Sequence, residues 1–318
     1  MLYKILYLPA RLFIHFFCRR IIINNQNLLF EQGPLLIAAN HPNSFLDAII
    51  VAALFKNPVY SLTRGDAFAG KKITKILTSL NMLPVYRISE GAGNLDNNYF
   101  TFDECQHIFR NGGIVLIFSE GGCINEWHLR PLKKGTARLA LSAWQQNIPL
   151  KILPLGINYS SFRHFGKTVV LNFGDMINRN DIHGDLPGGK AVNEFNETLH
   201  QRLQQLVFEI EKNDTQKLKK YFYTPELFSK KILLFIPAVA GYLFHFPLYY
   251  LIHLSIKNKA TDHYDSIMTG LLFFLYPCYL LIITLSIFFI THRSIAFILL
   301  AFIPFTALCL LHFRRQIR

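Results

Sequence analysis

The uneven distribution of charge along this chain is the feature that most limits the folds it can adopt. The chain has 33 Lys/Arg and 20 Asp/Glu in 318 residues. The segment from Lys230 to Arg318 holds only eight of the Lys/Arg and two of the Asp/Glu. Three apolar runs fill that segment: Ile232–Ile256, Ile267–Ile290 and Ile295–Phe313. The last two are long enough to cross the hydrocarbon core of a bilayer as helices. We therefore predict a globular part followed by a membrane region.

The first apolar run is the least regular, because it contains Pro237, Pro247 and two histidines. It either crosses the membrane or lies at its surface as an interfacial or re-entrant segment. Positive charge gathers on the cytoplasmic side of membrane proteins. With the globular part in the cytoplasm, three crossings would leave five basic residues outside and three inside. Two crossings by a hairpin leave only Arg293 outside. This count favours the hairpin and predicts a cytoplasmic C-terminus.

The N-terminal segment Leu2–Ile23 is also apolar, but Lys4, Arg11, Arg19 and Arg20 interrupt it. It lacks a small-residue cleavage site, so it does not match a signal peptide. Its charges favour an interfacial helix in the headgroup region, and the alternative is a signal anchor that crosses the bilayer. We place a membrane-associated N-terminal helix in residues 1–28.

Composition narrows the possible partners of the globular part. Its 25 Lys/Arg and 18 Asp/Glu give a net charge of +7, which suits nucleic acid, anionic lipid or phosphorylated substrates. The chain has no zinc-finger spacing and no RNA-binding aromatic signature, so we expect no nucleic acid. Its five cysteines show no paired spacing, which argues against a disulfide framework or a metal site.

Between the two membrane-associated parts, strand and helix patterns alternate. Such alternation predicts an α/β sheet covered by helices, which we place in a domain spanning residues 29–229, with the membrane region at 230–318. The strands are expected at Leu35–Ala39, Val59–Thr63, Ile114–Ser119, Ile148–Ile157 and Thr168–Phe173. The helices are expected at Ser44–Phe55, Lys71–Leu80, Asp96–Asn111, Lys133–Gln146 and Ala191–Lys212.

His41 and Asp47 are the candidate catalytic pair. The apolar run Leu35–Ala39 ends at Asn40-His41-Pro42, and an apolar helix pattern follows. Asn43 or Ser44 can cap that helix, which places Asp47 in the first turn, facing back toward His41. A carboxylate beside a histidine fixes its tautomer and stabilises the imidazolium, so the pair suits a general base.

Two more groups of residues suit a phosphorylated substrate. The strand Ile114–Ser119 ends in Glu120-Gly121-Gly122, where glycines let backbone N–H groups approach a phosphate or an oxyanion. Arg64 follows a second strand and Arg87 follows a short apolar run. Arginine binds phosphate bidentately and stays charged in a partly buried pocket. The simpler interpretations are an ordinary strand–turn and solvated surface arginines.

In this order, these residues resemble the glycerolipid acyltransferase family of glycerol-3-phosphate and 1-acylglycerol-3-phosphate acyltransferases. That family carries an Asn-His…Asp block, an arginine block, a Phe-Pro-Glu-Gly block and an apolar block with proline. Here they read NHPNSFLD, LPVYR with TRGDAF before it, FSEGG and ILPLGIN. The resemblance covers about Leu29 to Asn158.

This chain departs from the family pattern at two blocks. Five residues separate His41 from Asp47 where four are usual, and Ser119 replaces the proline of the third block. Both the spacing and the Glu-Gly-Gly form resemble the branch that acylates glycerol 3-phosphate or dihydroxyacetone phosphate. Cys123 stands where the family often has arginine, which leaves Arg130, Lys133 or Lys134 to contact phosphate.

The resemblance implies an integral membrane enzyme of phospholipid biosynthesis with its catalytic domain on the cytoplasmic face. His41 would deprotonate an acceptor hydroxyl, which attacks an acyl thioester, and Asp47 would orient His41. The donor would be acyl-CoA or acyl carrier protein. The acceptor would be a glycerol phosphate or a lysophospholipid, and no metal or bound cofactor is required. Two alternatives stay open, which are a non-phosphate lipid acceptor and a non-catalytic lipid-binding membrane protein.

Overall fold

A computed structural model describes residues 2–86, 97–182, 188–225, 228–258, 262–314 and 316 of the chain. A seven-stranded sheet lies at its centre, in the order β1-β7-β6-β2-β5-β3-β4. All neighbouring strands are parallel except β6 and β7. The strands are β1 Cys18–Ile23, β2 Leu35–Ala39, β3 Val59–Arg64, β4 Met82–Val85, β5 Ile114–Phe118, β6 Lys151–Tyr159 and β7 Lys167–Phe173.

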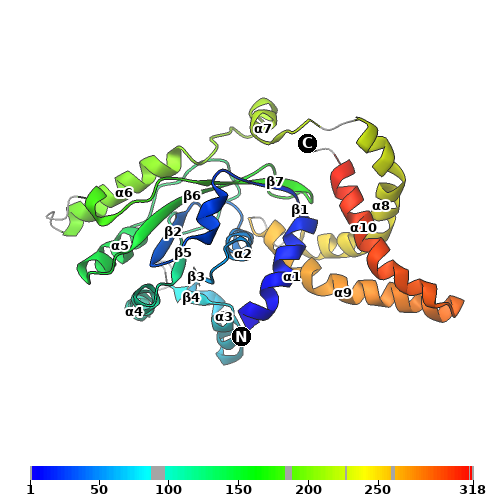
Figure 1. The fold of residues 1–318 in the computed structure, drawn as a ribbon, viewed down its shortest axis with the longest axis horizontal. Coiled ribbons are helices and arrows are strands. Elements are labelled where there is room, and N and C mark those ends of the chain that lie inside the picture. Colours follow the sequence, from blue (N-terminus) through cyan, green and yellow to red (C-terminus); the bar gives the residue numbers. More distant parts are fainter. Residues whose placement is uncertain are drawn as a thin grey trace.

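Helices cover both faces of this sheet, and a separate group of helices extends from one end of it (Figure 1). Those of the α/β part are α1 Leu2–Phe17, α2 Phe45–Leu54, α3 Lys71–Ser79, α4 Asn97–Arg110, α5 Gly135–Gln145, α6 Gly188–Gln204 and α7 Thr215–Phe222. The extending group consists of α8 Phe228–Ile256, α9 Tyr264–Thr291 and α10 Leu299–Phe313. The predicted α/β sheet with helices on it is confirmed.

Strand β2 shows how the sequence divides the core into two layers. Its residues are all buried, as expected for a central parallel strand, which reads as a continuous apolar run. Leu35, Ile37 and Ala39 face a cluster with α1 and α2, whereas Leu36 and Ala38 face a second cluster with α4, α5 and α6. This alternation is the two-residue period of a strand.

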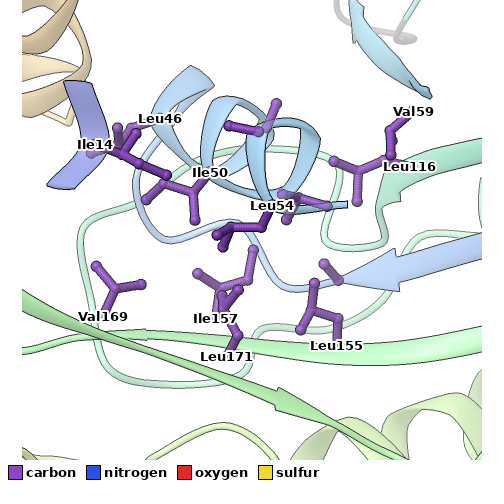
Figure 2. Close-up of a cluster of buried hydrophobic side chains, with 14 of the residues drawn as sticks. Ile14, Leu46, Ile50, Leu54, Val59, Leu116, Leu155, Ile157, Val169 and Leu171 are labelled. Carbon is purple, nitrogen blue, oxygen red and sulfur yellow. The ribbon is translucent and has the colours of Figure 1, made fainter. Parts of the chain in front are cut away.

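The first layer fixes α2 over the sheet. Figure 2 shows Leu46, Ile50 and Leu54 of α2 above Leu155 and Ile157 of β6, with Ile14 of α1 beside them; all are buried in one cluster. The three α2 positions are four residues apart, so they form one stripe along the helix. Leu46 precedes Asp47, and this packing therefore holds the start of α2 in place.

The structure corrects the expected N-terminal helix. That helix ends at Phe17, and Cys18–Ile23 instead form β1, the edge strand paired with β7. The run Ile21-Ile22-Ile23 is β-branched, and such residues favour strands over helices. The sheet thus begins before residue 29, where the α/β domain was expected to start. Strand β4 was also not among the predicted strands, and α6 ends at Gln204 rather than Lys212.

Among the described residues, three helices are long and apolar enough to cross a membrane: Ser229–Ile256, Tyr264–Thr291 and Ser294–Phe313. Helix α8 runs unbroken through Pro237 and Pro247, so the least regular of the three apolar runs is a single helix. Whether it crosses the membrane or lies at its surface stays a prediction. Prolines are tolerated where neighbouring helices support the freed backbone groups. Here α10 packs so closely on α8 that a Cβ on Gly241 would overlap the carbonyl oxygen of Thr306.

Candidate active site

The predicted site residues follow neighbouring strands at one edge of the sheet. His41 comes after β2 and Glu120 after β5, Arg64 ends β3, and Tyr159 ends β6. These four strands are adjacent and mutually parallel, so their carboxyl ends meet at the same edge. Ligands of open α/β sheets bind at this edge. The fold therefore brings together residues that lie more than a hundred positions apart.

His41 and Asp47 are in direct contact, as their spacing predicted. The Nδ1 atom of His41 lies 2.9 Å from Oδ2 of Asp47, and the two side chains are 16% and 0% exposed. The imidazole also stacks on the ring of Phe118, with centroids 3.8 Å apart. Because Nδ1 is held by the carboxylate, Nε2 is the ring nitrogen that can accept a proton from another molecule.

Asp47 receives two further hydrogen bonds that hold its carboxylate in place. The backbone N–H of Asn43 donates to Oδ2 at 2.8 Å, and the hydroxyl of Tyr159 donates to Oδ1 at 2.7 Å. Burial, followed by the charge of Asp47, raises the pKa of Tyr159 well above its usual value, so the phenol keeps its proton.

Tyr159 was not among the site residues predicted from the sequence. It directly follows the fourth family block, at a strand end, and that position was the available signal.

The side chain of Glu120 holds the loop that carries His41. Its buried carboxylate accepts the backbone N–H of His41 at 2.9 Å and two bonds from Arg130, one from the backbone N–H at 2.9 Å and one from the guanidinium at 2.8 Å. The Arg130 guanidinium also donates to the carbonyl of Gly122. Glu120 and Arg130 were both predicted to bind substrate. Here they bind each other and the loop, and neither lines the cavity beside His41.

Gly121 and Gly122 line that cavity, and the first needs to be glycine. Its φ of 67° lies in the left-handed region, and a Cβ there would come within 2.7 Å of Cγ of Lys133. The N–H of Gly121 donates to the carbonyl of Phe118 at 3.1 Å. Because this bond closes the turn, the N–H of Gly121 is not the one that would approach the phosphate or oxyanion predicted for the Glu-Gly-Gly turn.

A cavity of about 1820 Å³ opens beside His41. Much of its wall is apolar and comes from three helices: Tyr7 and Phe13 of α1, Phe45 and Ile49 of α2, and Phe273 of α9. Among the described residues, four Lys/Arg side chains also line it, from the end of β3 and the start of α5: Arg64, Lys133, Lys134 and Arg138. The cavity therefore offers surface for an apolar chain together with positive charge for an anion.

The basic part of the wall combines predicted and unpredicted residues. Arg64 is half exposed and pairs with Asp66, and Lys133 was also predicted. Arg138 was missed, because its position within a helix pattern gave no sign that the first turns of α5 face the cavity. The N-terminus of a helix favours anions, and α5 begins at Gly135, between these cations. Arg87 lies outside the described residues.

Cys123 lies against the catalytic loop, in the position where the family often has arginine. Its sulfur accepts the N–H of Ser44 at 2.9 Å. Burial, followed by the charge of Asp47, raises the pKa of the thiol to about 12. The thiolate is the reactive form of cysteine, so this residue is chemically quiet at neutral pH.

A histidine oriented by a buried carboxylate, beside an apolar cavity with basic residues in its wall, can act as a general base toward a hydroxyl on an amphipathic substrate. Comparison with known proteins agrees with this chemistry. Residues 20–158 match the protein family described as Acyltransferase. This part of the chain is similar to glycerolipid acyltransferases, because the relatives that match it include glycerol-3-phosphate and 1-acylglycerol-3-phosphate acyltransferases.

Three relatives illustrate the range of the match. An uncharacterized acyltransferase of Schizosaccharomyces pombe is 30% identical over 112 residues, which are 35% of this chain and 16% of the relative. Glycerol-3-phosphate O-acyltransferase 1 of Saccharomyces cerevisiae is 33% identical over 88 residues, 27% and 12% of the two chains. The chloroplastic 1-acyl-sn-glycerol-3-phosphate acyltransferase BAT2 of Brassica napus is 24% identical over 182 residues, 57% and 49%. The chain thus spans at most about half the length of these relatives.

Among solved structures, the 1-acyl-sn-glycerophosphate acyltransferase PlsC of Thermotoga maritima aligns with a TM-score of 0.45 and 12% identity. The alignment covers 70% of this chain and 81% of that one.

Proposed function

We propose that this chain is a membrane-bound O-acyltransferase. It moves an acyl group from acyl-CoA or acyl carrier protein to a hydroxyl of a glycerol phosphate or a lysophospholipid, as a step of phospholipid biosynthesis. One observation carries the proposal: the His41–Asp47 pair adjoins a cavity whose wall is apolar along three helices and also bears four cations. An acyl chain fits the apolar wall, and a phosphate fits the cations.

The reaction follows from the orientation of His41. Nε2 accepts the proton of the acceptor hydroxyl as its oxygen bonds to the thioester carbonyl carbon. The tetrahedral intermediate then collapses, the carbon–sulfur bond breaks, and the leaving sulfur takes the proton from His41. Asp47, 2.9 Å from Nδ1, stabilises the imidazolium between these steps. The reaction needs no reactant other than the acyl thioester and the acceptor.

The basic side chains would bind the acceptor phosphate. Arg64 and Arg138 come from different elements, β3 and α5, so together they can hold an anion from two sides. The guanidinium offers a planar fork of donors that matches phosphate oxygens. Lys133 and Lys134 add charge at the start of α5. This arrangement favours a phosphorylated acceptor over a neutral lipid.

The proposed membrane arrangement places the α/β part on the cytoplasmic face, where acyl thioesters are made. Helix α1 fits an interfacial position, because Ile5, Leu8 and Leu12 are exposed apolar residues on a helix that also carries Lys4 and Arg11. An acyl chain could then reach the cavity, which α1 also lines, from the adjoining lipid.

Full-length protein in lipid nanodiscs tests the proposal. It is incubated with oleoyl-CoA or oleoyl acyl carrier protein and, in separate reactions, with glycerol 3-phosphate, lysophosphatidic acid or a neutral monoacylglycerol. Mass spectrometry then identifies the products. We expect acylation of a phosphorylated acceptor. Acylation of the neutral lipid alone would refute the phosphate assignment, and absence of every product would refute the enzymatic function.

A further inference from the structure

The first turn of α9, at the start of a candidate membrane span, contacts the loop that carries His41. The imidazole of His263 lies 2.8 Å from the hydroxyl of Ser44. The backbone carbonyl of Asp262, two residues before α9, accepts a bond from the side chain of Asn125, which also donates to the carbonyl of Pro42. Tyr264 and Met268 belong to the same buried cluster as α2. This turn is therefore part of the α/β core as well as of the membrane region.

Ser266 completes the start of α2. Ser44 occupies the N-cap position, but its side chain makes no capping bond, and its φ of 54° is unusual for a residue other than glycine. The exposed N–H groups of a helix start need partners. Ser266 supplies one, because Leu46 N–H donates to its hydroxyl at 3.1 Å and the hydroxyl donates to the carbonyl of Asn43 at 2.7 Å. A residue of another helix thus caps α2.

Asp265 acts on the neighbouring residue of the loop. Its carboxylate accepts the side-chain N–H of Asn43 at 3.0 Å and pairs with the ammonium of Lys167, and both charged groups are buried. The backbone N–H of Asn43 in turn donates to Asp47 at 2.8 Å. A buried ion pair is weak evidence for stability alone, because desolvation offsets much of its attraction. Asp265 is instead connected to the catalytic carboxylate through Asn43, so the ion pair of Asp265 and Lys167 can serve to position Asp47.

We propose that Asp265 and Ser266 are positioning residues for the His41–Asp47 pair, so that the first turn of α9 forms part of the catalytic centre. This inference rests on the proposed function of that pair. It predicts that catalysis depends on the position of α9 relative to the α/β part, because any shift of α9 moves Asn43 and the start of α2.

The first test is Ser266→Ala, with Ser255→Ala as its matched control. Ser255 is an exposed residue of α8, and its hydroxyl bonds to the carbonyl of Leu251 in the same helix. In Ser266→Ala we expect kcat to fall up to about a hundredfold, the usual cost of displacing a catalytic group by about 1 Å. The KM values for donor and acceptor should stay within about twofold, since neither Asp265 nor Ser266 lines the substrate cavity. Ser255→Ala should match the wild type.

The second test isolates the bond to Asn43 without leaving a buried charge unpaired. In both double variants Lys167→Met removes the ammonium. Asp265→Asn retains an acceptor for Asn43, whereas Asp265→Leu has a similar size and retains none. We expect the double variant with Asp265→Asn to keep most of the kcat and the one with Asp265→Leu to lose it. Equal kcat in the two proteins would overturn the role of Asp265.

Hydrogen exchange of backbone amides separates this inference from the proposed function, since it needs no turnover. The amide of Leu46 should exchange faster in Ser266→Ala, while amides of β5 stay protected. Unchanged exchange at residues 43–46 would overturn the inference, and so would faster exchange with unchanged kcat. If the wild-type protein transfers no acyl group, the proposed function fails, and the exchange data still decide whether α9 holds the loop.

Discussion

Tyr159, at the end of β6, donates a hydrogen bond of 2.7 Å to Asp47, at the start of α2. Both side chains are buried, and Asp47 also holds the imidazole of His41. The tyrosine therefore fixes the carboxylate oxygen that does not face the histidine. A buried carboxylate that loses a donor loses about 1.5–3 kcal/mol of interaction.

Tyr159→Phe should accordingly lower kcat about tenfold or more, while both KM values stay close to those of the wild type. The ring is kept, so the packing of Tyr159 against Phe162 survives. Steady-state kinetics with the acceptor identified in nanodiscs give the answer. Phe162→Leu changes the same cluster without touching Asp47 and serves as the control for packing. A Tyr159→Phe enzyme with full kcat would show that the hydroxyl is not needed to hold the carboxylate.

Arg64 and Arg138 should matter for phosphorylated acceptors specifically. Loss of a charge-assisted bond to phosphate costs about 1.5–3 kcal/mol, which is about a ten- to a hundredfold rise in KM. We expect this rise for Arg64→Lys and Arg138→Gln with glycerol 3-phosphate, because lysine lacks the planar fork and glutamine lacks the charge. With a neutral monoacylglycerol the effect should shrink.

Arg110→Gln is the matched control for these arginine variants, since Arg110 is exposed on α4 and bonds to Gln146 away from the cavity. Equal losses with phosphorylated and neutral acceptors would mean that Arg64 and Arg138 maintain the structure of the site rather than bind phosphate.

Cys123 should be dispensable as a nucleophile. With its pKa raised to about 12, only about one thiol in ten thousand is ionised at pH 8. The shift keeps the thiol protonated at every pH well below 12. Iodoacetamide at pH 8 should therefore alkylate Cys123 slowly in the folded protein and readily after denaturation.

Cys123→Ser should retain most of the activity, since its oxygen can still accept the N–H of Ser44. Rapid alkylation of the folded protein, together with loss of turnover, would indicate a covalent acyl-cysteine route.

The C-terminus should lie in the cytoplasm. Helix α9 begins at the His41 loop, and α10 ends beside β1, where the guanidinium of Arg19 donates to the carbonyls of His312 and Arg314. The chain thus leaves the α/β part along α9 and returns to it along α10, which packs mainly on α8, with the turn at His292 and Arg293 far from the sheet (Figure 1). This course supports crossings by α9 and α10 with that turn on the far side of the membrane. A cysteine added after Arg318 should react with an impermeant reagent only after the cells are opened. Efficient labelling of intact cells would indicate three crossings.

The sequence predicted those parts of the fold and site that depend on local patterns. The buried strand, the apolar helix after it and the spacing of His41 and Asp47 all lie within about twenty residues, so periodicity was sufficient. Strand β1 was missed because an apolar segment with four basic residues reads equally well as an interfacial helix. The contribution of Tyr159 and Ser266 depends on β6 and α9 reaching the same loop, and no local pattern encodes that meeting.

Glu120 illustrates a different limit of sequence reasoning. An acidic Gly-Gly turn at a strand end predicted a residue that faces substrate. Its carboxylate is instead taken up by the backbone N–H of His41 and by Arg130, which lies ten residues further along the chain. Which of two nearby charges meets the substrate is decided by the loop that joins them, and composition does not define that loop.

The most direct measurement of the central claim is single-turnover acyl transfer by full-length His41→Ala and Asp47→Asn proteins in nanodiscs. Asp47→Asn keeps the shape of the side chain but removes the charge that supports the imidazolium, so we expect a loss of about 10³- to 10⁴-fold. His41→Ala should lose at least as much, and both proteins should bind the acyl donor as the wild type does. Near-normal transfer by either protein would contradict the account.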